Sequence, residues 1–439
     1  FHTPEPSYDR SSFSSTTSGN YSRGSVSKTW HLNRAFYNYS YNEQVPAIAI
    51  DRICGVRRLA GHFGRTVGVD FVDSKTLVSC AYDAKMILWD VESGLKRAWV
   101  NLPPGSIPTC CSVERTERRL MACGGFNASI EVFDITKCMK AGKHGLFNNL
   151  DNFVNQSSGK GNKEQGGGKA QVGENPLHEA KKQDAMYACK LTSQHEVVLN
   201  GHKSFITDLA WCLEGKRLIS TSGDSTATVW DMEVRGKLVS YTGHKDDINS
   251  VAVSPADQHV FVTAGQDGRC LVWDTRTKKD VASRKSETQG KGKEKRASIS
   301  YFEPTSTFTT SLEKESVAIN CVTFFPDGQA FLAGSEDGTA SVYDLRCDSM
   351  VTSIEANEAG SPVNSCLFSA SGRLIFLGGA DGNIRVYDLT RQERAPPMRS
   401  SDSLCMLDAH KAEVNALALS PDGLTVASAS DDMGIYIWK

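Results

Sequence analysis

Short apolar runs recur along the chain, and a turn of small and polar residues follows each of them. Such runs lie at residues 77–79, 217–220, 259–263 and 425–428. Each leads into a turn that carries an aspartate, and a second apolar run then ends in an aromatic ring, as at residues 86–89. Pro-Asp-Gly sequences at 326–328 and 421–423 are typical of tight hairpin turns. The pattern predicts an all-β chain built from short antiparallel strands.

Seven copies of one spacing divide the chain into repeats. In each copy an aspartate or asparagine precedes an aromatic ring by six positions, at Asp83/Trp89, Asn127/Phe133, Asp224/Trp230, Asp267/Trp273, Asp337/Tyr343, Asp381/Tyr387 and Asp432/Trp438. Gly-His pairs at 61–62, 201–202 and 243–244, and Ala-His at 409–410, lie upstream of four copies. A period of roughly 44 residues with Gly-His and aromatic-Asp pairs marks the four-stranded blade of a WD-repeat β-propeller.

The seven repeats predict a ring of seven blades, because a single blade cannot bury both of its faces and a closed ring can. The last repeat ends one residue after Trp438, so its blade must take the outermost strand from elsewhere. Residues 57–59, just before the first Gly-His pair, are the natural donor. We therefore expect the two ends of the propeller to meet in one blade.

Two spacings break the period. Insertions at about 137–190 and 278–310, rich in Lys, Gly, Ser and Thr, separate Phe133 from Trp230 and Trp273 from Tyr343. They are expected to be loops between complete blades. Residues 1–54, rich in Ser, Tyr and Thr, are expected to form a mostly irregular arm, and residues 55–439 to form the propeller.

Four repeats share the same set of four polar positions. The sets are His62, Ser79, Asp83 and Trp89; His202, Ser220, Asp224 and Trp230; His244, Thr263, Asp267 and Trp273; and His410, Ser428, Asp432 and Trp438. A hydroxyl, an imidazole and a carboxylate are also the parts of a catalytic triad. Fourfold recurrence favours a structural tetrad instead, in which the Trp N–H, hydroxyl, His and turn Asp form a hydrogen-bond relay. The sequence predicts no catalytic residue, and we expect no enzyme.

Composition narrows the function classes. The net charge of −2 gives no global attraction to nucleic acid, and no run of 18 apolar residues could span a membrane. The 13 cysteines include no C-x-x-C pair, which argues against a zinc site, so neither a metal nor a cofactor is expected. Many of the cysteines lie in apolar runs, as buried free thiols of a reducing compartment would. We expect a cytoplasmic protein that binds other proteins.

Several stretches resemble the β subunit of heterotrimeric G proteins. Residues 121–125, 222–226, 319–346 and 371–374 resemble the family's second, third, fifth and sixth blades, respectively. The stretches thus follow one another along the chain in the same order as the family's blades. The resemblance covers about residues 55–439 outside the insertions. It implies that the narrow top of the propeller binds a Gα-type GTPase and effectors. Carried over by position, the candidate contact residues are Arg65, Lys85, Ile87, Lys96, Phe126, Phe205, Asp247 and Glu336.

The chain departs from that family at the expected interface. Ser106 and Asp431 stand where the family presents tryptophans, Val67 replaces a tyrosine, and Asn249 replaces a methionine. Large aromatic residues anchor interfaces, so their loss predicts weaker or altered Gα binding. The family also opens with a long helix that coils with a γ subunit, whereas residues 1–54 show no sustained heptads.

Two functions therefore stay open from the sequence. The first is a divergent signalling subunit that binds a Gα-like GTPase or effectors, with or without a γ-like partner, and associates at most peripherally with the inner face of the plasma membrane. The second is a WD-repeat scaffold of Gβ ancestry built into a larger assembly, such as a ciliary or cytoskeletal complex, without a Gα partner.

Overall fold

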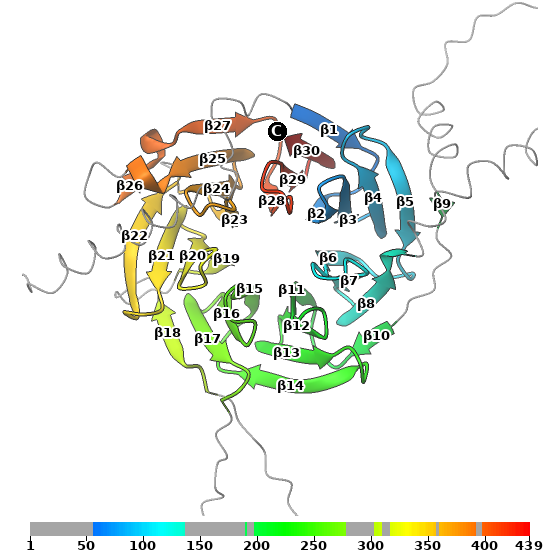
Figure 1. The fold of residues 1–439 in the computed structure, drawn as a ribbon, viewed down its shortest axis with the longest axis horizontal. Coiled ribbons are helices and arrows are strands. Elements are labelled where there is room, and N and C mark those ends of the chain that lie inside the picture. Colours follow the sequence, from blue (N-terminus) through cyan, green and yellow to red (C-terminus); the bar gives the residue numbers. More distant parts are fainter. Residues whose placement is uncertain are drawn as a thin grey trace, which may run out of the picture.

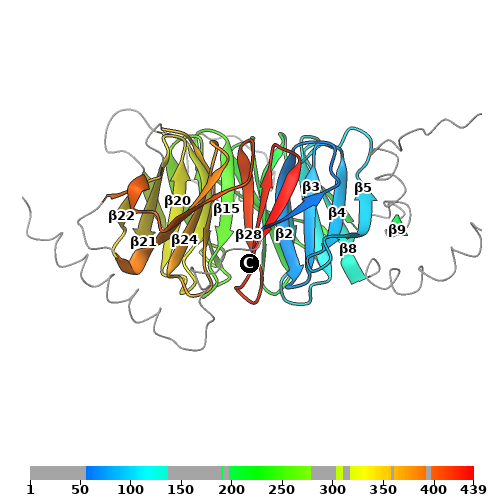
Figure 2. The same ribbon diagram turned by 90° about the horizontal axis from the view of Figure 1, so that it is seen from above.

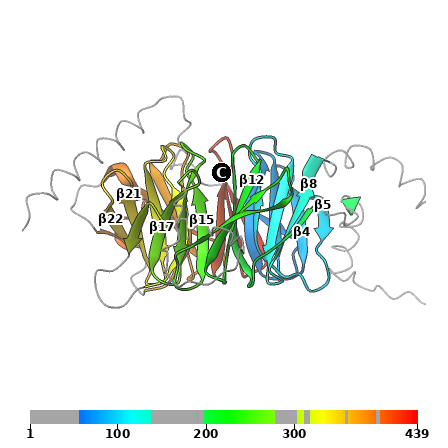
Figure 3. The same cartoon turned by 90° about the horizontal axis from the view of Figure 1, so that it is seen from below.

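Seven antiparallel sheets stand side by side around a central axis in the computed structural model (Figure 1). The structure describes residues 56–136, 189–190, 197–277, 303–309, 317–356, 360–391 and 397–439. Seen from the two sides, the sheets form a flat disc with loops on two opposite faces (Figures 2 and 3). The predicted seven-bladed β-propeller is confirmed.

The first three blades follow the chain from its start. Blade 1 contains β2 (Thr66–Asp73), β3 (Thr76–Ala81), β4 (Lys85–Asp90) and β5 (Lys96–Asn101), with β9 (Cys189–Lys190) added in parallel at its outer edge. Blade 2 contains β6 (Pro108–Val113), β7 (Leu120–Gly125), β8 (Ser129–Asp134) and β10 (Val197–Asn200). Blade 3 contains β11 (Ile206–Cys212), β12 (Arg217–Ser222), β13 (Thr226–Asp231) and β14 (Gly236–Thr242).

The next three blades repeat this order. Blade 4 contains β15 (Ile248–Val253), β16 (Val260–Gly265), β17 (Arg269–Asp274) and β18 (Ser306–Thr309). Blade 5 contains β19 (Ile319–Phe324), β20 (Ala330–Ser335), β21 (Thr339–Asp344) and β22 (Ser349–Glu355), with β26 (Met398–Arg399) added in parallel. Blade 6 contains β23 (Val363–Phe368), β24 (Leu374–Gly379), β25 (Asn383–Asp388) and β27 (Cys405–Asp408). Two 3-10 turns, η2 (Leu389–Arg391) and η3 (Ser400–Asp402), lie between β25 and β27.

Blade 7 joins the two ends of the propeller. It contains β28 (Val414–Leu419), β29 (Val426–Ser430) and β30 (Gly434–Trp438), and its outermost strand is β1 (Val56–Ala60). β1 pairs antiparallel with β30, with Val56 opposite Trp438 and Ala60 opposite Gly434. The expected closure by the segment around residues 57–59 is therefore observed.

The two insertions enter the sheets at a different point from the one expected. Residues 137–196 connect β8 to β10, and residues 278–305 connect β17 to β18. Each insertion thus falls between the third and the outermost strand of one blade, and the expectation that it lies between complete blades is wrong. The reason is that the sequence repeat is offset by one strand from the blade, since the outermost strand follows the aromatic-Asp pair. β18 also lies inside the span assigned to the second insertion.

The core lies between neighbouring blades, where apolar side chains of one sheet pack on those of the next. One cluster joins Leu77 and Trp89 of blade 1 to Ala427, Ile437 and Leu59 of blade 7. All five side chains are at most 1% exposed. Because every blade packs on two others, no single blade can be removed without exposing two apolar faces.

The first strand of every blade lines the central axis (Figure 1), and polar side chains there join consecutive blades. Asp70 Oδ2 accepts the Val113 N–H of blade 2 at 2.9 Å. Asp208 Oδ2 accepts the Val251 N–H and the Ser250 hydroxyl of blade 4, both at 2.9 Å. Burial, with a smaller effect from the charge of Asp70, raises the pKa of Asp208 to about 6 against the hydrogen bonds from Val251 and Ser250.

Asp208→Asn is expected to change how stability depends on pH. The folded protein holds the Asp208 proton more tightly than the unfolded chain, whose aspartates titrate near pH 4, so this contribution is fully present below about pH 4. It is lost as pH rises through about 6. The free energy of unfolding of the variant should therefore fall less than that of the parent protein between pH 4.5 and 6.5. Urea unfolding at pH 4.5, 5.5 and 6.5 measures this free energy. Asp73→Asn at the end of β2 is the control, and parallel pH curves for Asp208→Asn and the parent protein would contradict the expectation.

Candidate protein-interaction face

Strand order decides which loops share a face of the disc. In a four-stranded antiparallel blade, the loop that enters the first strand and the turn between the second and third strands lie on the same side. We call this side the top face. In blade 1 it carries residues 61–65 and 82–84, and in blade 3 it carries residues 201–205 and 223–225. The turns after the first and third strands lie on the opposite, bottom face.

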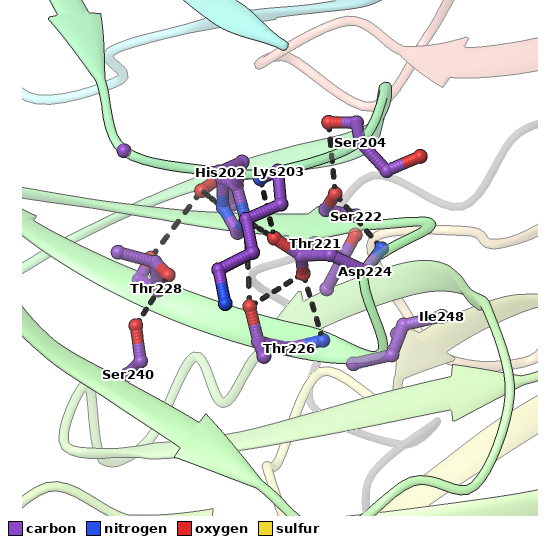
Figure 4. Close-up of polar contacts among 12 residues, drawn as sticks. His202, Lys203, Ser204, Thr221, Ser222, Asp224, Thr226, Thr228, Ser240 and Ile248 are labelled. Carbon is purple, nitrogen blue, oxygen red and sulfur yellow. Dashed lines mark hydrogen bonds and ion pairs between the residues drawn. The ribbon is translucent and has the colours of Figure 1, made fainter.

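A buried relay fixes the top-face loops of blade 3. The Trp230 Nε1–H donates to Ser220 Oγ at 2.8 Å, and Ser220 Oγ lies 2.7 Å from His202 Nε2. His202 Nδ1 lies 3.0 Å from Asp224 Oδ2, which also accepts the Lys203 N–H at 2.8 Å (Figure 4). All groups are satisfied when Ser220 donates to Nε2 and His202 Nδ1–H donates to Asp224. The relay ties the Gly-His loop to the turn that carries Asp224.

The other three tetrads have the same geometry. The imidazole Nε2 lies 2.7 to 2.8 Å from the hydroxyl, and Nδ1 lies 3.0 to 3.1 Å from the turn carboxylate, in the sets headed by His62, His244 and His410. The Trp N–H donates to the hydroxyl at 2.8 to 3.0 Å. Ser79, Ser220, Thr263 and Ser428 are each 0% exposed. A substrate cannot reach these hydroxyls, so the tetrads support the blades.

Electrostatics agree with an ionised turn aspartate. Burial alone would raise the pKa of Asp224, but hydrogen bonds from His202, Thr226 and the Lys203 amide outweigh it and hold the pKa well below its usual value. The carboxyl groups of Asp83, Asp267 and Asp432 also have a lowered pKa, for corresponding reasons. Burial holds the pKa of His410 below its usual value, although the neighbouring Asp432 acts to raise it.

Seven of the eight candidate contact residues are exposed or half-buried. Arg65, Phe126 and Glu336 are exposed on top-face loops, and Lys85, Phe205 and Asp247 are half-buried there. Lys96, at the start of β5, is also half-buried, and its ammonium donates to the Gly61 carbonyl at 3.2 Å.

Ile87 is not available to a partner, and its assignment as a contact residue is wrong. The side chain is 1% exposed and packs with Leu77 and Trp89 between blades 7 and 1. The physical reason is the alternation of side chains along a strand, which turns position 87 of β4 into the interface between blades.

Ser106 and Asp431, which stand where the related family has tryptophans, both interact with other polar side chains of this protein. Ser106 is 4% exposed and lies beside Glu131, whose pKa burial raises to about 7 against the hydrogen bond from Ser106. Asp431 pairs with Arg65 at 3.0 Å and accepts the Asn415 side-chain N–H at 2.7 Å. Neither position offers an apolar anchor on the top face.

Exposed apolar side chains of the top face lie elsewhere than at Ser106 and Asp431. Phe63 is 60% exposed, Phe126 50%, and Tyr82 and Ile107 40% each. The rings of Tyr82 and Phe126 meet edge to face at 6.1 Å, and those of Phe126 and Phe205 lie 5.7 Å apart. We call these five residues the apolar ridge, and it runs across blades 1 to 3. Of these five residues, only Phe126 and Phe205 were predicted contact residues, although Phe63 and Tyr82 directly flank His62 and Asp83 in loops that the motif places at the surface.

Comparison with known proteins agrees with this architecture. The family model described as WD domain, G-beta repeat matches residues 193–231 and 236–274. A model of the N-terminal domain of nucleolar protein 10-like proteins matches residues 304–439. With seven blades and four tetrads, the chain is a WD-repeat β-propeller.

Within that class, the chain is a divergent protein similar to guanine nucleotide-binding protein β subunits. It is 26% identical to the β subunit of Arabidopsis thaliana over 399 residues, which cover 89% of the chain and 84% of the relative. It is 25% identical to the β subunit of Oryza sativa subsp. japonica over 400 residues, 88% of the chain and 83% of the relative. The β-1 subunit of Nicotiana tabacum is 25% identical over 305 residues, and the match spans 60% of that relative. In the described part of the chain, no helix has the length and hydropathy needed to cross a membrane.

Proposed function

We propose that this protein is a non-enzymatic interaction platform that binds a Gα-type GTPase or its effectors through the top face. Support comes from the similarity to β subunits over 89% of the chain. Further support comes from the top-face side chains that are open to a partner, with Arg65, Phe126 and Glu336 exposed and Lys85, Phe205 and Asp247 partly so. The fully buried tetrad hydroxyls argue against catalysis at those positions.

A second candidate function is a scaffold of Gβ ancestry within a larger assembly, such as a ciliary or cytoskeletal complex, without a Gα partner. One observation favours it. Ser106 and Asp431, where the family presents tryptophans, are engaged inside this protein, so the usual aromatic anchors are absent from the centre of the top face. Only the first proposed function includes a γ-like partner. In the related family a γ subunit coils with an N-terminal helix, and residues 1–54, where such a helix would be sought, lie outside the described residues.

The proposed place of action is the cytoplasm, with at most peripheral contact at the inner face of the plasma membrane. Ten described cysteines are free, and seven of them are buried. Free buried thiols are typical of a reducing compartment.

Mass spectrometry of the native complex, purified in GDP, separates the two functions. A Gα subunit and a γ-like peptide at near-equal stoichiometry are expected for the signalling subunit. Recovery of structural proteins of one assembly, with no GTPase, would replace the first function by the second.

A further inference from the structure

The apolar ridge has the geometry of a binding anchor. Its rings come from loops of three consecutive blades, and the relays of His62 and His202 hold two of those loops in place. The Phe63 N–H donates to Asp83 at 3.0 Å, so the exposed phenylalanine stands on a loop that the buried carboxylate fixes. Exposed aromatic residues on a rigid base are the usual centre of binding energy in protein interfaces.

Free positive charge flanks the ridge. The Lys85 ammonium lies 5.5 Å from the centre of the Phe63 ring, and the Lys203 side chain is exposed next to the relay of His202. Among the described residues, neither lysine forms an ion pair with a carboxylate at 4 Å or less.

Three carboxylates beside the ridge already have partners within the protein. Asp83 pairs with His62, and Asp224 pairs with His202. Asp431 is held by Arg65, whose own side chain is 64% exposed. The ridge therefore presents aromatic side chains and lysine ammonium groups to a partner, whereas these three carboxylates are already paired within the protein.

Other top-face loops carry exposed carboxylates. Asp246, Glu336, Asp337 and Glu413 are exposed on the loops of blades 4, 5 and 7. Lys245 and Lys411 also lie there, beside Asp246 and Glu413. In the described top-face loops, the large exposed apolar residues lie on blades 7, 1 and 2, and they are Met433, Phe63, Tyr82, Ile107 and Phe126. The exposed carboxylates of blades 4 and 5 thus lie away from the apolar ridge, whereas blade 7 carries both charged residues and the apolar Met433.

We propose that the apolar ridge is the docking site for a partner segment in which two or more apolar side chains alternate with carboxylates. The apolar side chains would cover Tyr82, Phe126 and Phe205, and the carboxylates would pair with Lys85 and Lys203. This inference rests on the proposed function, because it names the chemistry of the partner at the top face. It also moves the anchor away from Ser106 and Asp431, toward blades 1 to 3.

Charge complementarity selects this occupant over a second copy of the chain. Two ridges facing each other would bring Lys85 and Lys203 of one copy against the same lysines of the other, and like charges across an interface oppose binding. A basic segment would meet the same repulsion. An acidic segment gains both the apolar contact and the ion pairs, and its association should weaken as salt is raised.

Selection from a random dodecapeptide phage library on the immobilised propeller tests the proposal. The enriched peptides are expected to be net acidic and to contain aromatic or aliphatic residues. Their affinity, measured by fluorescence anisotropy, should fall at least about 10-fold for Tyr82→Ala/Phe126→Ala and for Lys85→Glu/Lys203→Glu. Glu413→Lys, on a blade 7 loop of the same face and outside the ridge, is the matched control and should bind the peptides as tightly as the parent protein. The melting temperature of each variant shows that it is folded.

The proposal is overturned if no peptide family is enriched, if the enriched peptides are basic, or if they bind the ridge variants as well as the parent protein. A separate titration with Gα in GDP keeps the two proposals apart. A Gα that binds the ridge variants undiminished would retain the proposed function and remove the ridge as its anchor. Acidic peptides that bind the ridge of a propeller to which no Gα binds would retain the ridge and remove the GTPase partner.

Discussion

Leu59→Asp should lower the free energy of unfolding by about 4 kcal/mol or more. Leu59 is the buried side chain of β1, 1% exposed, and it packs with Leu77 and Trp89 across the junction where the ring closes. A carboxylate there would remain unpaired in an apolar cluster. The loss would also release β1 from β30 and leave blade 7 with an open edge.

Arg57→Asp on the same strand is the matched control. Arg57 is exposed, so its replacement should change stability by no more than about 0.5 kcal/mol. Equilibrium unfolding in urea, followed by tryptophan fluorescence, compares both variants with the parent protein. Equal midpoints for Leu59→Asp and Arg57→Asp would show that closure by β1 does not hold the ring together.

Asp224→Ala should cost about 2 to 4 kcal/mol, because it leaves several polar groups of the top-face turn without their acceptor. His202 Nδ1, the Lys203 N–H and the Thr226 hydroxyl all bond to this carboxylate. The buried imidazole would then disturb Ser220 and, through it, Trp230. Differential scanning calorimetry measures the loss.

Asp337→Ala is the control for this second variant, because it changes the same turn position in blade 5. There the carboxylate accepts from the Thr339 N–H and hydroxyl, and no histidine relay depends on it. Its replacement should cost about 1 kcal/mol. If both variants lost the same stability, the relay would carry no special role, and a hydrolase activity abolished in a folded Asp224→Ala protein would contradict a structural tetrad.

Much of the architecture could be predicted from the sequence because the repeat fixes the register of each blade. The six-residue spacing from Asp224 to Trp230 places the turn, the strand and the ring together, and the tetrads follow from it. Closure was predictable for a similar reason, since residues 57–59 precede the first Gly-His pair where an outermost strand is expected.

Other features depend on packing between blades, which the repeat does not encode. The family resemblance made Ile87 a candidate contact residue. In the folded protein its side chain packs instead against blade 7, which the repeat pattern does not reveal. Hydrogen bonds between consecutive blades, from Val113 to Asp70 and from Val251 and Ser250 to Asp208, could not be predicted from any local sequence pattern. The apolar ridge arises because neighbouring loops bring Tyr82, Phe126 and Phe205 together from distant parts of the chain.

Lysine-reactive cross-linking of the native complex, read by mass spectrometry, tests most directly whether the top face is the interaction surface. Lys203 and Lys245 lie on top-face loops and Lys85 lies at the top-face end of β4, whereas Lys75 and Lys216 lie on bottom-face turns. We predict that cross-links to partner proteins concentrate on the three top-face lysines and that the two bottom-face lysines remain open to modification. Partner cross-links confined to Lys75 and Lys216 would contradict the account.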